Sequence, residues 1–236
     1  MCIRDRDKMG TGLTFTNDGE HSLEIIWNNM NGGEGGSPKE TTLTNADYNL
    51  VENTGFMPGE SATPTFKIEF MPTLCAKLEE GDTLTITYYA TVNENALIAG
   101  DGNPNECLVT YGDSNTQTEK ASTVTYVWYV DVFKYAEVTE NGATVEKPLA
   151  GAKFKLCTDA AGTQSIALFD KGGNTYRVAK GSDVSVTEIT TDETGSFTIE
   201  GLDSGTYYLK ETVAPGGYNL LSETVAIVID NGGKIN

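Results

Sequence analysis

The segment "YYLKETVAPGGYNLL", residues 207–221, places an acidic side chain within an otherwise apolar strand pattern. Side chains alternate between the two faces of a strand, so Glu211 shares a face with Tyr207, Leu209 and Val213. The pattern then stops at the turn signal "PGG", residues 215–217. The segment therefore predicts a strand that directs one carboxyl group toward an apolar core.

A second segment, "YVWYVDVFKY" at residues 126–135, places a basic side chain within an apolar strand pattern. Its alternation places Lys134 on the face of Trp128, Val130 and Val132. An unpaired buried charge is costly, so we expect Lys134 and Glu211 to pair. The alternative interpretation is that Lys134 extends its ammonium group into solvent and that Glu211 is hydrated at a strand end.

A buried lysine–glutamate pair has a chemical consequence. Desolvation favours the neutral forms of an amine and a carboxyl group. A neutral amine is a nucleophile, and a protonated carboxyl group can polarise an amide carbonyl. Beside an asparagine carboxamide, the two groups can form a lysine–asparagine isopeptide bond and release ammonia. This chemistry takes place once, inside the fold, without turnover.

Short strand patterns separated by turns recur along the whole chain, as in "TGLTFT", "TFKIEFMP" and "GDTLTITYYATV". Such spacing is typical of antiparallel sandwiches. One short helical turn is expected near "PTLCAKLEEGD", and the polar segment "GDSNTQTEKAST" is typical of a linker. We predict an all-β protein with two tandem immunoglobulin-like β-sandwich domains, residues 1–124 and 125–236.

Composition excludes several classes of function. The 236 residues carry a net charge of -18, which disfavours nucleic acid as a partner, and no apolar run is long enough to span a membrane. His21 is the single histidine, it lies in an exposed turn, and the four cysteines form no metal motif. The sequence alone does not decide whether Cys75 and Cys107 form a disulfide. We expect no metal, no cofactor and no enzyme with turnover.

The chain ends are expected to be truncated. The opening "MCIRDR" lacks the apolar region of a secretory signal and resembles translated adapter sequence, so we expect residues 1–6 to be non-native. The last residues, "IDNGGKIN", indicate a hairpin turn.

The second half resembles the collagen-adhesin B-type domain. Its E-box pattern, Tyr-x-Leu-x-Glu-Thr-x-Ala-Pro-x-Gly-Tyr, fits residues 207–218, and "LAGAKFKL" and "VDVFKY" resemble strands of that family. The resemblance implies that Lys134 attacks an asparagine with assistance from Glu211. Asn231 is in phase with the last strand pattern and is one candidate, but we favour an asparagine beyond residue 236.

The first half resembles the middle domain of backbone pilins from sortase-assembled pili of Gram-positive bacteria. The resemblance lies in "DKMGTGLTF" and in the run from "GDTLTITYYATVN" to "GDGNPNECLVTYGDS". It implies a second isopeptide site, with Asp7 as the assisting acid, Asn105 as the acceptor and Asn103 as the alternative acceptor. The lysine is expected upstream of residue 1.

Together these resemblances imply a structural pilus subunit, secreted and anchored to the cell wall at the cell surface. Its partners would be other pilin subunits, joined by a sortase, and host matrix or a host cell surface. The alternative function is a surface adhesin whose B-type domain is a stalk that presents a host-matrix-binding region.

Overall fold

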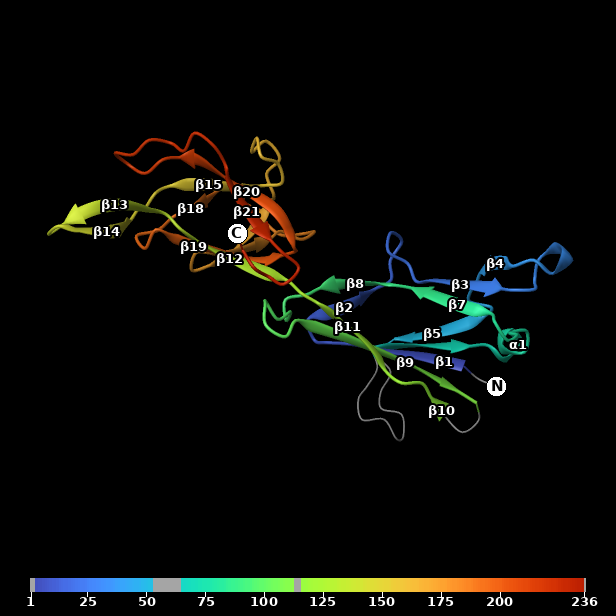
Figure 1. Cartoon of the computed structure of the whole chain (residues 1–236). Coiled ribbons are helices and arrows are strands. Elements are labelled where there is room, and N and C mark those ends of the chain that lie inside the picture. Colours follow the sequence, from blue (N-terminus) through green and yellow to red (C-terminus); the bar gives the residue numbers. More distant parts are fainter. Residues whose placement is uncertain (1–2, 53–64, 113–115, 236) are drawn as a thin grey trace. The chain divides into compact units, whose positions relative to one another are not determined.

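The computed structural model describes residues 3–52, 65–112 and 116–235 (Figure 1). The chain divides into two compact units. Unit 1 contains Met1–Leu97 and Gly102–Thr125, and unit 2 contains Ile98–Asp101 and Tyr126–Asn236. No helix in the described ranges is long and apolar enough to cross a membrane.

Unit 1 is built around a six-stranded antiparallel sheet in the order β10-β9-β1-β6-β5, with β11 also paired to β9. Its strands are β1 (Ile3–Met9), β5 (Tyr48–Glu52), β6 (Phe66–Phe70), β9 (Asn103–Tyr111), β10 (Thr116–Gln117) and β11 (Ala121–Thr125). The segment expected to be a linker, residues 112–123, therefore contains two strands. Both strands pair with the edge of β9, and their side chains are exposed, so they lack the alternation of a half-buried strand.

Two smaller sheets complete unit 1: β2 (Leu13–Thr16) pairs with β8 (Tyr89–Val92), and β3 (Glu24–Asn29) lies between β4 (Lys39–Thr42) and β7 (Thr83–Thr87). The expected helical turn is confirmed as α1 (Pro72–Cys75), and a single 3-10 turn, η1, spans Glu34–Gly36. The core contains Phe66, Ile68 and Phe70, whose shared face the alternation of β6 predicts.

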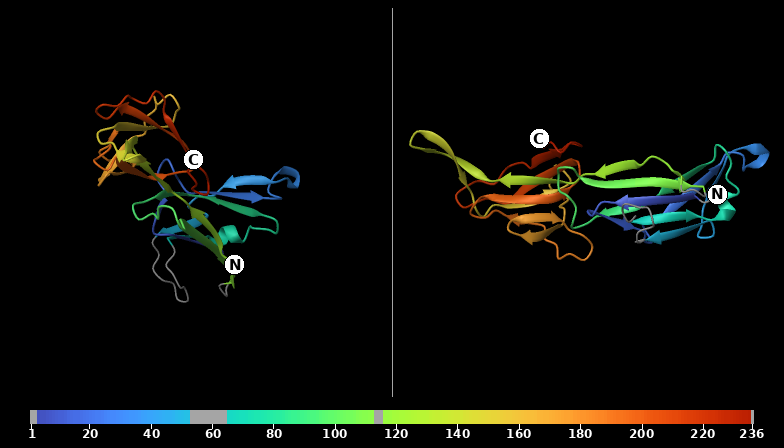
Figure 2. Two further views of the ribbon diagram at one scale, coloured as in Figure 1. Left: turned by 60° about the vertical axis from the view of Figure 1, so that its left-hand side comes forward. Right: turned by 90° about the horizontal axis from the view of Figure 1, so that it is seen from below.

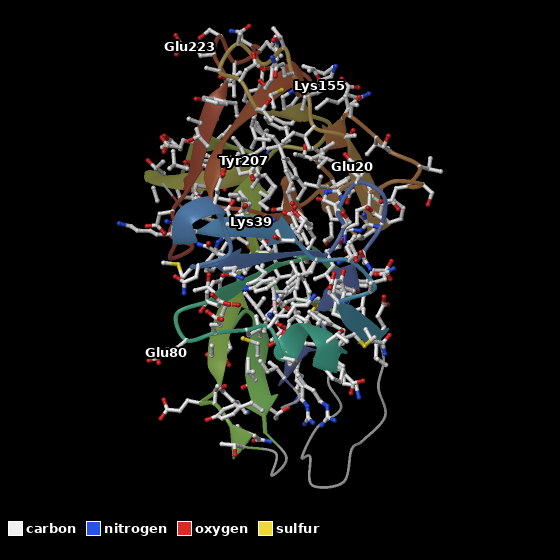
Figure 3. All side chains as sticks on the ribbon, turned by 90° about the vertical axis from the view of Figure 1, so that its right-hand side faces the viewer. Glu20, Lys39, Glu80, Lys155, Tyr207 and Glu223 are labelled. Carbon is white, nitrogen blue, oxygen red and sulfur yellow. The ribbon has the colours of Figure 1, made fainter. Side chains whose placement is uncertain are left out.

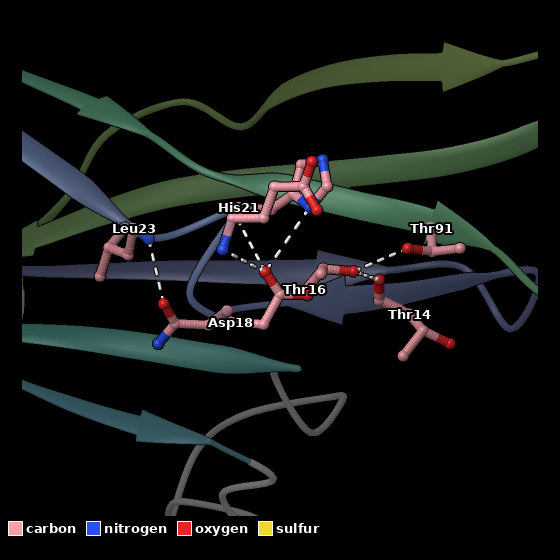
Figure 4. A network of polar contacts seen from close by, with 8 residues as sticks. Thr14, Thr16, Asp18, His21, Leu23 and Thr91 are labelled. Atoms are coloured by element: carbon pink, nitrogen blue, oxygen red, sulfur yellow. Dashed lines mark hydrogen bonds and ion pairs between the residues drawn. The ribbon is translucent and has the colours of Figure 1, made fainter. Parts of the chain in front are cut away.

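Asp18 holds the turn that connects β2 to β3, two strands of different sheets (Figure 4). Asp18 Oδ1 accepts hydrogen bonds from the backbone N–H groups of Glu20 at 2.9 Å and His21 at 2.7 Å. These bonds hold the pKa of Asp18 below its usual range. The predicted exposure of His21 is confirmed, since its side chain is 46% exposed.

Unit 2 consists of two four-stranded sheets and a hairpin (Figures 1 and 2). One sheet has the order β12-β19-β17-β16: β12 (Trp128–Phe133), β19 (Ser196–Leu202), β17 (Thr175–Val178) and β16 (Leu168–Gly172). The other has the order β18-β15-β20-β21: β18 (Ile189–Thr190), β15 (Lys153–Cys157), β20 (Gly205–Val213) and β21 (Val225–Ile229). The hairpin joins β13 (Tyr135–Glu140) to β14 (Ala143–Pro148). All pairs are antiparallel except β17 with β19.

The two sheets of unit 2 contribute to one apolar core. Phe197 and Ile199 from β19 are buried in the same cluster as Phe154, Leu156 and Leu209 from the other sheet. Charged side chains such as Glu20, Glu80 and Glu223 lie on the surfaces of their units (Figure 3). The excess of acidic residues is therefore largely solvated, and the few buried charges stand out.

The backbone on either side of Lys134 is fixed by a close approach of Gly195. The N–H group of Lys134 donates to the Gly195 carbonyl at 2.8 Å, and the Lys134 carbonyl accepts from Leu149 N–H at 2.9 Å. Gly195 has a φ of 70°, and a Cβ added there would lie 2.5 Å from the Lys134 carbonyl oxygen. Only glycine fits both the positive φ and this contact.

We predict that Gly195→Ala destabilises unit 2 by about 2 kcal/mol or more, because backbone strain and a clash with the Lys134 carbonyl add together. Gly173→Ala is the matched control, since Gly173 has a φ of 62° but open space around its Cα. The control should lose only about 1 kcal/mol. Peptide-resolved hydrogen exchange in urea measures both variants. Equal losses at the two positions would show that the contact with Lys134 is unimportant.

Candidate functional site

Lys134 and Glu211 form a buried ion pair in unit 2. Lys134 follows β12 directly and Glu211 lies in β20, so each of the two sheets supplies one partner. Lys134 Nζ lies 3.0 Å from Glu211 Oε1, and the side chains are 16% and 0% exposed. The pairing predicted from the two strand patterns is therefore confirmed, and the solvated alternative is wrong.

The turn after β20 explains how the Glu211 carboxylate is held in an apolar core. The chain reverses at residues 215–218, where Tyr218 N–H donates to the Pro215 carbonyl at 3.1 Å. It then returns over β20, and the N–H group of Leu221 donates to Glu211 Oε2 at 2.8 Å. Within the described ranges Glu211 Oε1 has no well-aligned hydrogen bond, and the lysine ammonium is its ionic contact. One carboxylate oxygen is thus anchored and the other faces Lys134.

Asp7 and Asn105 meet in the interior of unit 1. Asp7 lies in β1, Asn105 lies in the neighbouring β9, and Asn105 Nδ2 donates to Asp7 Oδ2 at 3.3 Å. The Asp7 residue is 0% exposed. Its burial raises the pKa of the carboxyl group above the usual value, although hydrogen bonds from Tyr88 and Asn105 act in the opposite direction. The acid is therefore biased toward the neutral form that can polarise a carbonyl.

Asn103 has a different environment from Asn105. Its Oδ1 accepts from Leu97 N–H at 2.9 Å, and its Nδ2 donates to the carbonyls of Leu97 at 3.1 Å and Thr125 at 3.2 Å. Both polar atoms of this carboxamide therefore form hydrogen bonds with the backbone. The structure thus brings Asn105, rather than Asn103, to Asp7.

The site of unit 1 includes a residue that the sequence did not single out. Tyr88 O–H donates to Asp7 Oδ2 at 2.5 Å, and Asn105 Nδ2 donates to the Tyr88 hydroxyl at 2.7 Å. Burial and the contact with Asp7 raise the pKa of Tyr88 above its usual value, so it is a neutral hydroxyl. Tyr88 alternates with Leu84 and Ile86 in the sequence, which places it on an apolar face, but a strand pattern alone does not show which groups the phenol oxygen contacts.

Neither unit shows all three members of a lysine–asparagine site within the described residues. Asn231 is exposed in the turn after β21, and no hydrogen bond or ion pair in the described ranges joins it to Lys134 or Glu211. Likewise, no described lysine bonds to Asp7 or Asn105. The three cysteines of the described part, Cys75, Cys107 and Cys157, are free thiols. No described cluster of His, Cys, Asp and Glu side chains could hold a metal ion.

Comparison with known proteins identifies the class of fold. Residues 135–236, most of unit 2, match the SpaA family, described as a prealbumin-like fold domain. Over 94% of its length the chain is 23% identical to the trypsin-resistant surface T6 protein of Streptococcus pyogenes serotype M6. The chain spans 36% of that relative, or about a third of its length.

Solved structures of pilus proteins align with the chain and share its fold. The major pilin GBS80 of Streptococcus agalactiae, as a 35 kDa C-terminal fragment, aligns with 97% of this chain and 79% of its own at a TM-score of 0.64 and 19% identity. The group B streptococcus pilus 2b backbone protein aligns with 99% of this chain and 79% of its own at a TM-score of 0.61 and 22% identity. The predicted fold class, two tandem immunoglobulin-like β-sandwiches, is confirmed.

The burial of the Lys134–Glu211 pair gives a stability prediction. Glu211→Ala should destabilise unit 2 by about 3 kcal/mol or more, because it leaves the Lys134 ammonium largely buried without its partner. Glu188→Ala is the control, since the Lys153–Glu188 pair is 43% and 38% exposed and should contribute under about 1 kcal/mol. Urea denaturation monitored by hydrogen exchange distinguishes them. A cost at Glu211 no greater than at Glu188 would contradict the buried pair.

Buried carboxyl groups in β1 predict a pH dependence of unit 1. Asp5 is 7% exposed, and burial together with the charge of Asp7 raises its pKa from 3.8 to about 6. Because the folded pKa exceeds the unfolded value, folding favours the neutral acid. The resulting stabilisation is complete below about pH 4 and is lost as the pH rises through about 6.

The Asp5→Asn variant lacks this titration. Between pH 4 and pH 7 we expect the wild type to lose roughly 2 kcal/mol of stability relative to Asp5→Asn, as judged by urea denaturation at each pH. The same pH dependence in both proteins would show that Asp5 is not buried as a neutral acid.

Proposed function

We propose that the chain is a structural part of a cell-surface pilus subunit, and that each of its two units is stabilised by one autocatalytic lysine–asparagine bond. The observation that carries the proposal is the Lys134–Glu211 pair, with 3.0 Å between Nζ and Oε1 and a glutamate side chain that is 0% exposed. A buried pair is a poor source of stability compared with apolar packing, so its presence calls for another role.

The reaction in unit 2 follows from the positions of these groups. A proton passes from the Lys134 ammonium to Glu211, which leaves a neutral amine and a protonated carboxyl group. The amine nitrogen attacks the side-chain carbonyl carbon of an asparagine while the carboxyl group donates a hydrogen bond to the carbonyl oxygen. The new C–N bond replaces the bond to the amide nitrogen, which takes up the second proton of the attacking nitrogen and departs as ammonia. Glu211 then passes the proton that it received from Lys134 to solvent, and no further turnover follows.

The acceptor asparagine of unit 2 is proposed to lie beyond residue 236. The turn at residues 230–234 supports this, because Asp230 Oδ1 accepts from Gly232 N–H and Lys234 N–H and fixes a hairpin that carries Asn231 on its exposed tip. An antiparallel bridge between Ile229 and Ile235 shows the chain returning alongside β21. A strand continuing from there is a suitable carrier of the acceptor.

In unit 1 the proposed acid and acceptor are Asp7 and Asn105, with the lysine upstream of residue 1. The support is that Asp7 is fully buried, hydrogen-bonded to Asn105, and has a raised pKa. A covalent tie between distant strands restricts the unfolded chain as a disulfide does. Such ties would suit a secreted shaft that is exposed to pulling and proteases.

The proposed assembly follows the relatives. Pilus backbone proteins share this fold, and we propose that the parent protein is joined to other pilin subunits by a sortase and anchored to the cell wall, where the pilus supports adhesion to host surfaces. A mutant bacterium that lacks the parent gene should lose the ladder of covalent polymers from its cell-wall extract. An unchanged ladder would overturn this assignment.

We predict that the parent chain, extended in both directions, is lighter than its calculated mass by two ammonia molecules. Residues 1–236 alone should show the full calculated mass, because the two partners lie outside. In the extended chain Asp7→Ala and Glu211→Ala should each retain one ammonia, while Glu188→Ala, the exposed control, should lose both. Intact-mass spectrometry with tryptic mapping around Lys134 and Asn105 measures this. An extended wild type at full mass would contradict the proposal.

A further inference from the structure

Tyr88 occupies a junction between two sheets of unit 1. It lies between β7, which ends at Thr87, and β8, which begins at Tyr89, and these strands belong to different sheets. From this junction its hydroxyl reaches Asp7 in β1 and Asn105 in β9. Tyr88 is therefore the one described residue whose side chain bonds to both members of the proposed site.

Aromatic packing fixes the ring of Tyr88. The ring meets Phe66 edge-on, with 5.0 Å between centroids, and its centroid lies 6.2 Å from that of Phe15. Phe15 and Phe66 also contact each other at 4.3 Å. A phenol ring packed against two other aromatic rings has little freedom to move its hydroxyl, so the oxygen is pre-positioned.

The hydrogen bonds of Tyr88 determine which atoms remain free. Asp7 Oδ2 accepts from both Tyr88 and Asn105, and Asn105 Nδ2 is held by Tyr88 and Asp7. Asp7 Oδ1 and Asn105 Oδ1 are both buried and have no hydrogen-bond partner among the residues that the structure describes. Buried polar atoms without partners are costly, and in a reactive centre they mark where a reacting group enters.

We propose that Tyr88 is a third member of the reactive centre of unit 1, which orients the Asn105 carboxamide by its nitrogen and the Asp7 carboxyl group by Oδ2. The arrangement leaves Asp7 Oδ1 to accept a proton from an incoming lysine ammonium, after which the neutral amine attacks the side-chain carbonyl carbon of Asn105. The nitrogen held by the Tyr88 hydroxyl takes up the second amine proton and leaves as ammonia. This inference rests on the isopeptide bond proposed for unit 1.

The direct test replaces Tyr88 with phenylalanine in the extended parent chain. Tyr88→Phe removes the hydroxyl and keeps the ring that packs on Phe15 and Phe66. Tyr48→Phe is the matched control, because Tyr48 is a buried tyrosine of the same core. Each chain is made by cell-free synthesis, and loss of ammonia from the Asn105 peptide is followed over time by mass spectrometry.

We expect the Tyr88→Phe chain to form the unit 1 bond at least about tenfold more slowly, with the Tyr48→Phe chain at the wild-type rate. Bond formation in Tyr88→Phe at the wild-type rate would overturn the role of Tyr88 alone. A wild type that never forms the bond, while the bond of unit 2 does form, would overturn the proposed function of unit 1 and this inference with it.

A second readout separates orientation from folding. Carboxyl ¹³C NMR on residues 1–236 follows the titration of Asp7, whose charged form the Tyr88 hydrogen bond stabilises. The other titratable groups near it, Asp5 on β1 and Cys107 on β9, are the same in both proteins. Tyr88→Phe should therefore shift the Asp7 titration to higher pH, while Tyr48→Phe should not. An unmoved titration would show that the hydroxyl does not hold Asp7.

Discussion

The structure of unit 2 depends on one constraint, which is that an ammonium and a carboxylate inside an apolar core must neutralise each other. Lys134 and Glu211 satisfy it from two different sheets, with 3.0 Å between their charged atoms. The turn at residues 215–218 brings the N–H group of Leu221 back to the Glu211 carboxylate. Gly195 is required because its Cα lies close to the Lys134 carbonyl oxygen. Without its partner, each charged group would be buried and unpaired, which would cost several kcal/mol of folding free energy.

The two units solve the same problem of holding a buried acid in different ways. In unit 2 a backbone N–H group of a returning loop fixes one carboxylate oxygen. In unit 1 a tyrosine hydroxyl and a carboxamide share that task. In both cases one oxygen of the acid is anchored while the other has no aligned hydrogen bond within the described residues. The shared feature is thus an acid with one anchored oxygen, and its other oxygen is the one that the proposed reaction assigns to the lysine.

The sequence predicted the parts of the site that follow from strand alternation. Lys134 and Glu211 could be placed in the core because each interrupts an apolar period of two, and their burial confirms it. Tyr88 could not be recognised, because it lies where the chain passes from one sheet to another and its role depends on contacts with β1 and β9. The choice between Asn103 and Asn105 also required the structure. The two residues are two positions apart in one strand, so alternation places both on the same face, and only their surroundings distinguish them. The segment at residues 112–123 was mistaken for a linker because its two edge strands have exposed side chains and therefore show no apolar alternation.

The central claim is that these buried acids serve to join a lysine to an asparagine. The most direct measurement is an NMR spectrum of the extended parent protein in which only the lysine side-chain nitrogens carry ¹⁵N. The account predicts two signals of secondary amides, one of which disappears when Lys134 is replaced by arginine. A spectrum with ammonium signals alone would contradict it and would leave Lys134 and Glu211 as an ordinary buried ion pair.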